Sequence, residues 1–202
     1  MRDLPDRGRL WLALATALSA GALLGSRADP TAIDWQPALA AAQPWRALTA
    51  VFVHYSTLHL AANLLGASLV GALGRVARVP GRTVVAWLVA WPLTQFGLLL
   101  RPDLLHYGGL SGVLHAGVAC VAFHLIVHGQ GLRRAIGVAT LAGLAVKVLG
   151  ESPWGAALRH PAGWDIATAP FAHASGVVAG LVAATLCDVA ARTNPRSPEP
   201  RR

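Results

Sequence analysis

The sequence predicts an all-α integral membrane protein with a bundle of six transmembrane helices. Of its 202 residues, 54% are hydrophobic and only 13% are charged, whereas a soluble domain carries about a quarter charged residues. The mean hydropathy is +0.51. Six apolar runs alternate with short segments that hold nearly all of the charges and prolines. We therefore expect residues 10–191 to form one helical membrane domain.

The first apolar run, Leu10 to Gly25, follows a basic tail at residues 1–9. It is short for a span, since a bilayer needs about 17–25 residues. A signal peptide has a similar basic head and apolar middle, but we interpret the run as a retained helix. The next segment, Ser26 to Ala50, contains three prolines and two tryptophans. Proline breaks long helices and tryptophan favours the membrane interface, so we expect a loop on or partly in the outer leaflet.

Five further apolar runs complete the expected bundle, with Gly, Pro and Arg residues in the turns between them. The expected spans are residues 51–74, 83–100, 111–128, 135–150 and 171–191. Residues 192–202 are rich in arginine and proline, so we expect a disordered tail there.

The positions of the basic residues predict the orientation. With six spans, twelve of the seventeen Lys and Arg residues fall in the two tails and the loops on their side, and four fall on the other side; Lys147 lies within a span. Positive residues favour the cytoplasmic side, so both termini are expected to be cytoplasmic. The net charge of +8 would suit nucleic acid, but these charges are scattered over loops and tails, and we expect no nucleic-acid partner.

Polar residues cluster at one depth of the expected bundle. The second, fourth and sixth spans run in the same direction, and each begins with candidate catalytic groups. These groups are His54, His59, Asn63, Ser111 and His173. A polar residue within a membrane is energetically unfavourable, so several at one depth, near the outer side, indicate a functional site.

The candidate nucleophile is Ser111, in the segment Gly109-Leu110-Ser111-Gly112. A serine hydroxyl needs a base within hydrogen-bond reach to become a strong nucleophile. Gly109 and Gly112 allow a tight entry into the helix and a close approach of the backbone. The alternative is a helix-capping serine with glycines that serve packing.

The candidate base is His173, which Gly176 and Gly180 follow on the same helix face. Small residues at this spacing let two membrane helices approach closely, as a Ser–His hydrogen bond would require. His115, one turn after Ser111, is the competing base, and it otherwise lines the pocket or packs against a neighbouring span. The structural alternative is a histidine that is hydrogen-bonded to a backbone carbonyl in a packed interface.

His59 and Asn63 are the candidate oxyanion donors, together with the backbone N–H of Ser111. Their i, i+4 spacing puts both side chains on one helix face. Donors aimed at a developing negative charge stabilise the transition state. His54 is interpreted as a brace for the first loop or the pocket rim. Polar contacts between helices are the alternative for all three.

Other polar residues allow several interpretations. Lys147 and Glu151 form an i, i+4 pair at the outer end of the fifth span, either as an ion pair or as groups on the substrate path. No carboxylate is assigned to the Ser111–His173 pair, because Asp165 lies in a loop. The remaining groups are expected to be structural, with no metal, no cofactor and no disulfide: His124 with His128, and Cys120 and Cys187.

Taken together, these residues resemble the rhomboid family of intramembrane serine proteases. The resemblance runs in chain order from Trp45 to Gly180. It is carried by Trp45-Arg46 with Thr49 and Phe52, by His54, His59 and Asn63, by Gly109-Leu110-Ser111-Gly112, and by His173 with Gly176 and Gly180. The resemblance implies a six-helix bundle, a Ser111–His173 dyad, an oxyanion hole of His59, Asn63 and the Ser111 N–H, and cleavage of single-span membrane proteins in or near the bilayer.

Within that family the chain is most similar to the rhombosortases, a compact bacterial branch. The similarity rests on the small size, on Leu110-Ser111-Gly112-Val113-Leu114-His115 and on the Lys147-x3-Glu151 pair. It implies a multi-pass protein of the bacterial inner membrane with its site toward the periplasm. Its substrates would carry a C-terminal Gly-Gly, a hydrophobic helix and a basic tail.

Three other functions compete with this interpretation. A general rhomboid protease would accept broader substrates. A catalytically silent relative would bind membrane helices, although such relatives usually lack the serine or the histidine. A small transporter would use the histidines as a polar path, but no inverted repeat is visible in the sequence.

Overall fold

The computed structural model describes residues 8–193, and all of its regular structure is helical apart from two isolated β-bridges. Six long helices make up the bundle: α1 (Arg9–Gly25), α4 (Thr57–Ala77), α5 (Gly81–Gly97), α6 (Ser111–His128), α7 (Leu132–Gly150) and α8 (Pro170–Thr193). Short helices fill the loops: α2 (Pro30–Ile33), η1 (Pro37–Leu39), α3 (Arg46–Thr49), η2 (Ala50–Phe52) and η3 (Leu98–Leu100).

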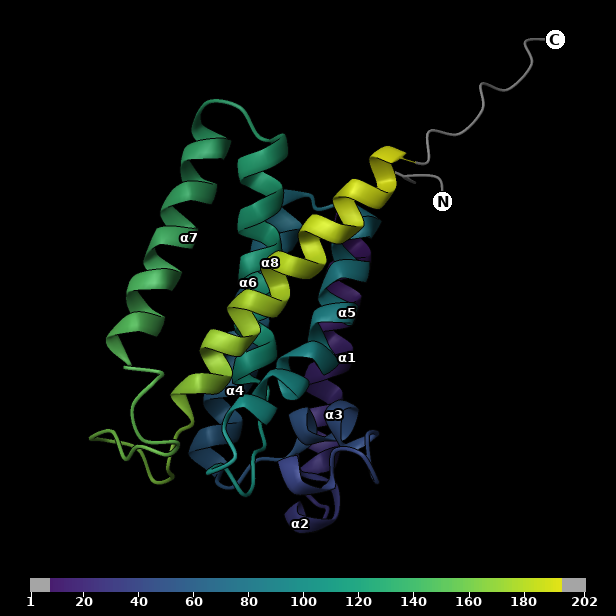
Figure 1. The fold of residues 1–202 in the computed structure, drawn as a ribbon. Helices are drawn as coiled ribbons and strands as arrows, with labels where there is room; N and C mark the ends of the chain where they lie inside the picture. The colour runs from purple at the N-terminus through teal and green to yellow at the C-terminus, as the bar shows by residue number, and fades with distance from the viewer. Residues whose placement is uncertain (1–7, 194–202) are drawn as a thin grey trace, which may run out of the picture.

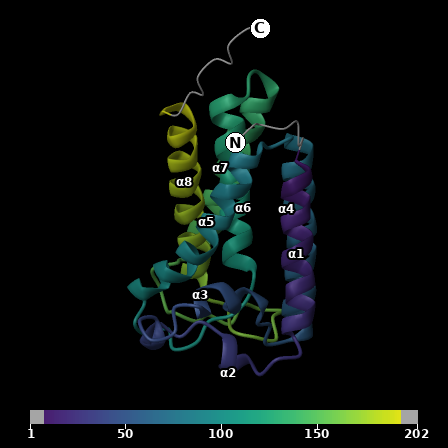
Figure 2. The same cartoon turned by 90° about the vertical axis from the view of Figure 1, so that its right-hand side faces the viewer.

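The long helices alternate in direction, so α4, α6 and α8 all begin at the same end of the bundle (Figure 1). That end also carries α2, α3 and the long connections before α4, α6 and α8 (Figure 2). The start of α1 and the end of α8 lie at the opposite end (Figure 1). This arrangement brings the first turns of three helices, where the candidate catalytic residues lie, to one depth.

Four helical segments are long and apolar enough to cross a membrane: Thr57–Ala77, Gly81–Leu100, Ser111–His128 and Pro170–Thr193. The membrane-helix character of the chain is therefore confirmed. The other two expected spans stay predictions, because α1 has only 17 residues and α7 carries Arg133, Arg134 and Lys147 within its 19 residues.

Most boundaries follow from local chemistry, and the largest difference from expectation is at the second span. The apolar run at residue 51 begins as the 3-10 turn η2, and α4 starts only at Thr57. Ser56 caps that helix, since its hydroxyl accepts from the backbone N–H of His59 at 3.0 Å. His54 consequently lies in the loop before the helix. At the other end of the chain, α8 continues to Thr193, two residues past the expected edge. The tails at 1–7 and 194–202 lie outside the described residues.

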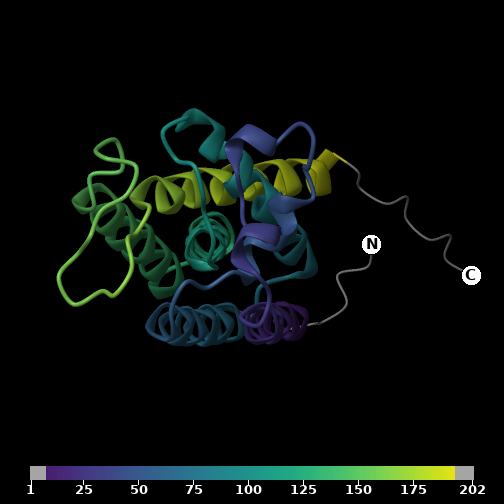
Figure 3. The ribbon, with the colours of Figure 1, turned by 90° about the horizontal axis from the view of Figure 1, so that it is seen from below.

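Helix α6 lies in the middle of the bundle, with α1 and α4 on one side and α8 on the other (Figure 3). It packs against α4, α5, α7 and α8. Two fully buried indoles fix its surroundings: Trp87 donates to the carbonyl of Val113, and Trp11 donates to the carbonyl of Val70, each at 2.8 Å. The two indoles stack with centroids 4.2 Å apart. Ser111 is the first residue of α6, which is more buried than the other three helical segments long and apolar enough to span a membrane.

The first loop is a packed structure held by a buried carboxylate. Asp34, which is 1% exposed, pairs with Arg46 at 3.4 Å and with His106 at 2.8 Å, and it accepts from the Tyr55 hydroxyl at 3.2 Å. Trp35 adds two backbone hydrogen bonds to Tyr107, each 2.8 Å long. The loop is thereby bonded to the segment that leads into α6.

Candidate active site

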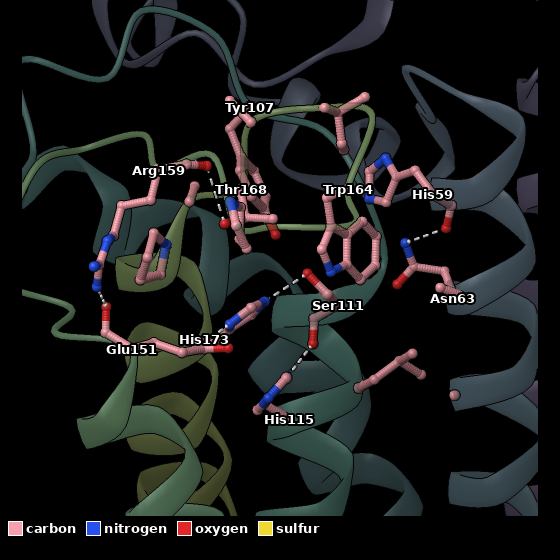
Figure 4. A pocket seen from close by; sticks show the side chains of 18 of the residues that line it. His59, Asn63, Tyr107, Ser111, His115, Glu151, Arg159, Trp164, Thr168 and His173 are labelled. Carbon is pink, nitrogen blue, oxygen red and sulfur yellow. Dashed lines mark hydrogen bonds and ion pairs between the residues drawn. The ribbon is translucent and has the colours of Figure 1, made fainter.

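Ser111 and His173 are hydrogen-bonded across two helices. The Ser111 Oγ lies 3.0 Å from Nε2 of His173, and Figure 4 shows the two side chains pointing toward each other. Ser111 is the first residue of α6 and His173 is in the first turn of α8. A serine with an imidazole nitrogen at this distance has the geometry of an activated nucleophile.

Glycines allow the close approach of α8 to α6 that this hydrogen bond needs. A methyl group at Gly176 would collide with the carbonyl oxygen of Gly112, and one at Gly180 would lie 2.5 Å from the carbonyl oxygen of Ala116. Both glycines therefore lie where α8 is close to the backbone of α6. Gly112 has the same role from the α6 side, since a methyl there would lie 2.9 Å from the carbonyl oxygen of Ala172.

The carboxylate of Glu151 is hydrogen-bonded to His173, whereas the sequence analysis assigned no carboxylate to the Ser111–His173 pair. Oε2 of Glu151 lies 2.6 Å from Nδ1 of His173. Glu151 comes directly after α7, and its carbonyl accepts from Nη1 of Arg159 at 2.7 Å. Burial by itself raises the pKa of Glu151, but hydrogen bonds from His173 and Lys147 outweigh that effect and lower the pKa to about 2. Glu151 is therefore ionised at neutral pH.

Lys147 and His115 extend the same cluster. Nζ of Lys147 lies 2.9 Å from Oε1 of Glu151 and 2.7 Å from Nε2 of His115. Nδ1 of His115 lies 2.6 Å from the carbonyl oxygen of Ser111. The rings of His115 and His173 stack, with centroids 4.3 Å apart and an interplanar angle of 14°. Because the His115 nitrogens face a carbonyl and an ammonium, His173 and not His115 is the imidazole that faces the Ser111 hydroxyl.

His59 and Asn63 line the same cavity as Ser111, from α4 on its other side. One Asn63 N–H donates to the carbonyl of His59 at 3.1 Å, which leaves the second N–H of the amide for another acceptor. Gly109 lies between these residues and Ser111 with φ +124°, a conformation that favours glycine. A methyl group on Gly109 would lie 2.6 Å from Nε2 of His59, so the glycine allows the backbone to approach the imidazole.

His54 lies behind His59, with their ring centroids 4.9 Å apart. Its Nδ1 is 3.3 Å from the carbonyl oxygen of Phe52. Burial lowers the pKa of His54, although the contact with Phe52 opposes the effect. His54 thus contacts Phe52 of η2 and His59 of α4 from the loop between them.

The cavity has a volume of about 730 Å³, within the usual range for ligand sites. Its walls come from α4, α6, α7, α8 and the loop at 151–169. Trp164 of this loop lines the cavity together with Ser111 (Figure 4). Asp165 is bonded to the α4 cap, because the Ser56 hydroxyl donates to its carboxylate at 2.8 Å. Asp165 thus bonds the loop to α4, and the carboxylate that is hydrogen-bonded to His173 is that of Glu151.

Sequence reasoning also missed one further residue of the site, Tyr107, and one ion pair outside the site. Tyr107 lines the cavity just before α6, and its buried hydroxyl lies beside Ser111 and Gly112 at the start of that helix. At the other end of α6, His128 binds Asp188 of α8 at 2.7 Å. Cys120 and Cys187 are free thiols, the first buried and the second partly buried.

Comparison with known proteins gives one family. The family model described as "Rhomboid domain" matches residues 41–188, which is more than half of the 202-residue chain. The matched range includes every candidate site residue. Among curated proteins, the comparison finds no match.

Proposed function

The chain belongs to the rhomboid family, and we propose that it is an intramembrane serine endopeptidase in which Ser111 is the nucleophile and His173 the general base. The observation that carries the proposal is the 3.0 Å contact between Ser111 Oγ and His173 Nε2 at the wall of a large cavity. Rhomboid-like proteins without activity exist, but this chain keeps both groups, and they are in contact.

The proposed reaction has two halves. The Ser111 Oγ attacks the scissile carbonyl carbon while its proton moves to Nε2 of His173, and the carbonyl electron pair moves to the oxygen. Collapse of this intermediate breaks the C–N bond, and the leaving amine takes the proton from Nε2. Water then attacks the acyl-enzyme by the same route, its proton moving to Nε2 and from there to the departing Ser111 oxygen.

The oxyanion would be held by His59, Asn63 and the backbone N–H of Ser111. The support for this assignment is that all three residues line one cavity and that Gly109, with its positive φ, lets the chain pass close to His59. The N–H of Ser111 belongs to the first turn of α6 and so has no acceptor within the helix. Preorganised donors of this kind act most strongly where water is excluded.

The proposed substrates are single-span membrane proteins. The support is that polar groups and apolar residues of the long helices line the same cavity. Apolar side chains from three long helices line part of it: Leu69 and Val70, Leu114 and Val118, and Leu144. We infer the bacterial inner membrane as the location, with cytoplasmic termini and the site toward the periplasm. The rhombosortase assignment adds substrates with a C-terminal Gly-Gly, an apolar helix and a basic tail.

A cleavage assay in bacterial membranes tests the proposal. One reporter carries the Gly-Gly, helix and basic tail; the other carries a generic helix with small residues at its outer end. We expect cleavage of the first reporter alone, and complete loss of cleavage in Ser111→Ala and His173→Ala at unchanged protein levels. Cleavage of both reporters would indicate a broader rhomboid protease. Unchanged turnover in either variant would refute the dyad, and cleavage of neither reporter without probe labelling of Ser111 would favour a silent helix-binding protein.

A further inference from the structure

The hydrogen-bonding pattern around His173 fixes which nitrogen carries the proton. As a base, His173 must accept the Ser111 hydroxyl at Nε2, so in the neutral ring the proton is on Nδ1. The atoms closest to Nδ1 are Oε2 of Glu151 at 2.6 Å and Nζ of Lys147 at 3.1 Å. Lysine offers no acceptor, so the Nδ1–H donates to Glu151.

The position of Glu151 is unfavourable for helix stability. It is the C-terminal cap of α7, where the helix dipole carries its partial negative charge and disfavours a carboxylate. It is also only partly exposed, with 32% of its side chain accessible. A carboxylate placed against both effects needs compensating partners, and here they are His173 and Lys147, each bonded to a different carboxylate oxygen.

Lys147 closes a ring of hydrogen bonds that begins and ends at Ser111. The ammonium donates to Glu151 and to Nε2 of His115, and Nδ1–H of His115 donates to the carbonyl of Ser111. The ring therefore joins the backbone and the hydroxyl of one residue through three helices. Every donor in it has an acceptor, which restricts the rotamers of both stacked imidazoles.

We propose that Glu151 is a positioning residue that completes a Ser111–His173–Glu151 triad, with Lys147 holding its carboxylate in place. This inference rests on the proposed function and deepens it. Glu151 keeps the Nδ1–H tautomer of His173 and faces the positive charge that appears when Nε2 takes the Ser111 proton. The carboxylate stays ionised throughout, so no proton passes to it.

The main test is Glu151→Gln, with Asp29→Asn as the matched carboxylate-to-amide control. Lys147 would attract the amide oxygen, so the amide NH₂ would face Nδ1 and favour the tautomer that cannot accept the Ser111 proton. Loss of the carboxylate in soluble triads lowers kcat by about 10⁴-fold, and we expect a loss of roughly 10²–10⁴-fold here with KM little changed. Asp29 is exposed and caps α2, a role that asparagine fills equally well, so its variant should keep the wild-type rate.

The Lys147→Met variant supplies a readout that a merely structural role would not move. In the Glu151→Gln background it frees the amide to turn its oxygen toward Nδ1, so the double variant should be faster than Glu151→Gln alone. A glutamate that only stabilised the fold would give a double variant no faster than either single one.

The pH profile gives a second independent readout. Because Glu151 favours the protonated form of His173 and Lys147 disfavours it, the acidic limb of kcat/KM should move to lower pH in Glu151→Gln and to higher pH in Lys147→Met. The titratable and charged groups that face His173 or line its cavity are His115, Lys147, Glu151, His59, His106, Arg159, His160, Tyr55 and Tyr107. Of these, only Glu151 and Lys147 are changed, so the opposite shifts report on them.

Each result separates the triad from the protease itself. Glu151→Gln at the wild-type rate, with Ser111→Ala and His173→Ala inactive, would overturn the triad and leave the dyad. Absence of activity and of Ser111 labelling in the wild-type protein would overturn the proposed function instead. If Glu151→Gln does not fold, NMR of the wild-type protein with labelled histidine still decides: a strongly downfield Nδ1 proton on His173 supports the triad, and an ordinary shift contradicts it.

Discussion

The contact between α6 and α8 predicts that one methyl group, two helical turns from His173, will strongly lower the proposed protease activity. In Gly180→Ala the new methyl would lie 2.5 Å from the Ala116 carbonyl oxygen, whereas ordinary contacts begin at 3.4 Å. Relieving this overlap by a rigid shift moves α8 away by about 0.9 Å. The same shift would lengthen the Ser111–His173 contact from 3.0 Å to about 3.9 Å, beyond the hydrogen-bond limit.

The expected loss is large because catalysis depends on this distance. A misplacement of about 1 Å can lower the rate by roughly 10²-fold, and overpacking adds about 1–3 kcal/mol of destabilisation. Gly143→Ala is the matched control, since nothing lies within 4 Å of the methyl it would add to α7. Alanine is the better helix former, by roughly 1 kcal/mol, so this variant should be fully active.

The assay is reporter cleavage in membranes, with Tm measured in detergent for each variant. We expect a roughly 10²-fold lower rate for Gly180→Ala at a folded protein level, and a wild-type rate for Gly143→Ala. A wild-type rate in Gly180→Ala would refute the argument that the glycines set the Ser111–His173 distance. An equal loss in Gly143→Ala would show that any methyl on the bundle is harmful and would refute it too.

Two further variants test the other side of the cavity. Asn63→Ala should lower kcat by roughly 10²–10³-fold while a serine-reactive probe still labels Ser111, and a full cleavage rate would show that Asn63 serves packing only. Gly109→Ala combines a disfavoured φ of +124° with a methyl 2.6 Å from His59, so it should lose both activity and stability, measured as a lower Tm. A fully active Gly109→Ala would contradict the close approach of this segment to His59.

Much of the site could be predicted from the sequence, because its signals are local. The glycines around Ser111 and after His173, and the i, i+4 spacing of His59 and Asn63, lie within single segments and indicate the proposed chemistry directly. Alternating spans then bring the three segments to one depth, which Figure 1 bears out for α4, α6 and α8. The start of α4 was set too early because an apolar stretch at residues 50–52 forms a 3-10 turn, and hydropathy does not distinguish the two.

The role of Glu151 could not be predicted in the same way. The sequence shows it as half of an i, i+4 pair with Lys147, which is typical of a surface ion pair. Its contact with His173 spans 22 positions of the chain and depends on where α7 ends relative to α8. The Asp34 network and the His128–Asp188 pair were missed for the same reason, since each joins residues that only the packed bundle brings together.

The most direct test of the account is covalent labelling of Ser111 in native membranes. A fluorophosphonate probe reacts only with a serine that a base activates, and peptide mass spectrometry identifies the modified residue without any knowledge of the substrate. We predict a single adduct on Ser111 in the wild-type protein, which disappears in His173→Ala while the protein stays folded. Labelling of Ser111 at the same rate in His173→Ala, or no labelling of folded wild-type protein, would contradict the claim that these two residues form the catalytic centre.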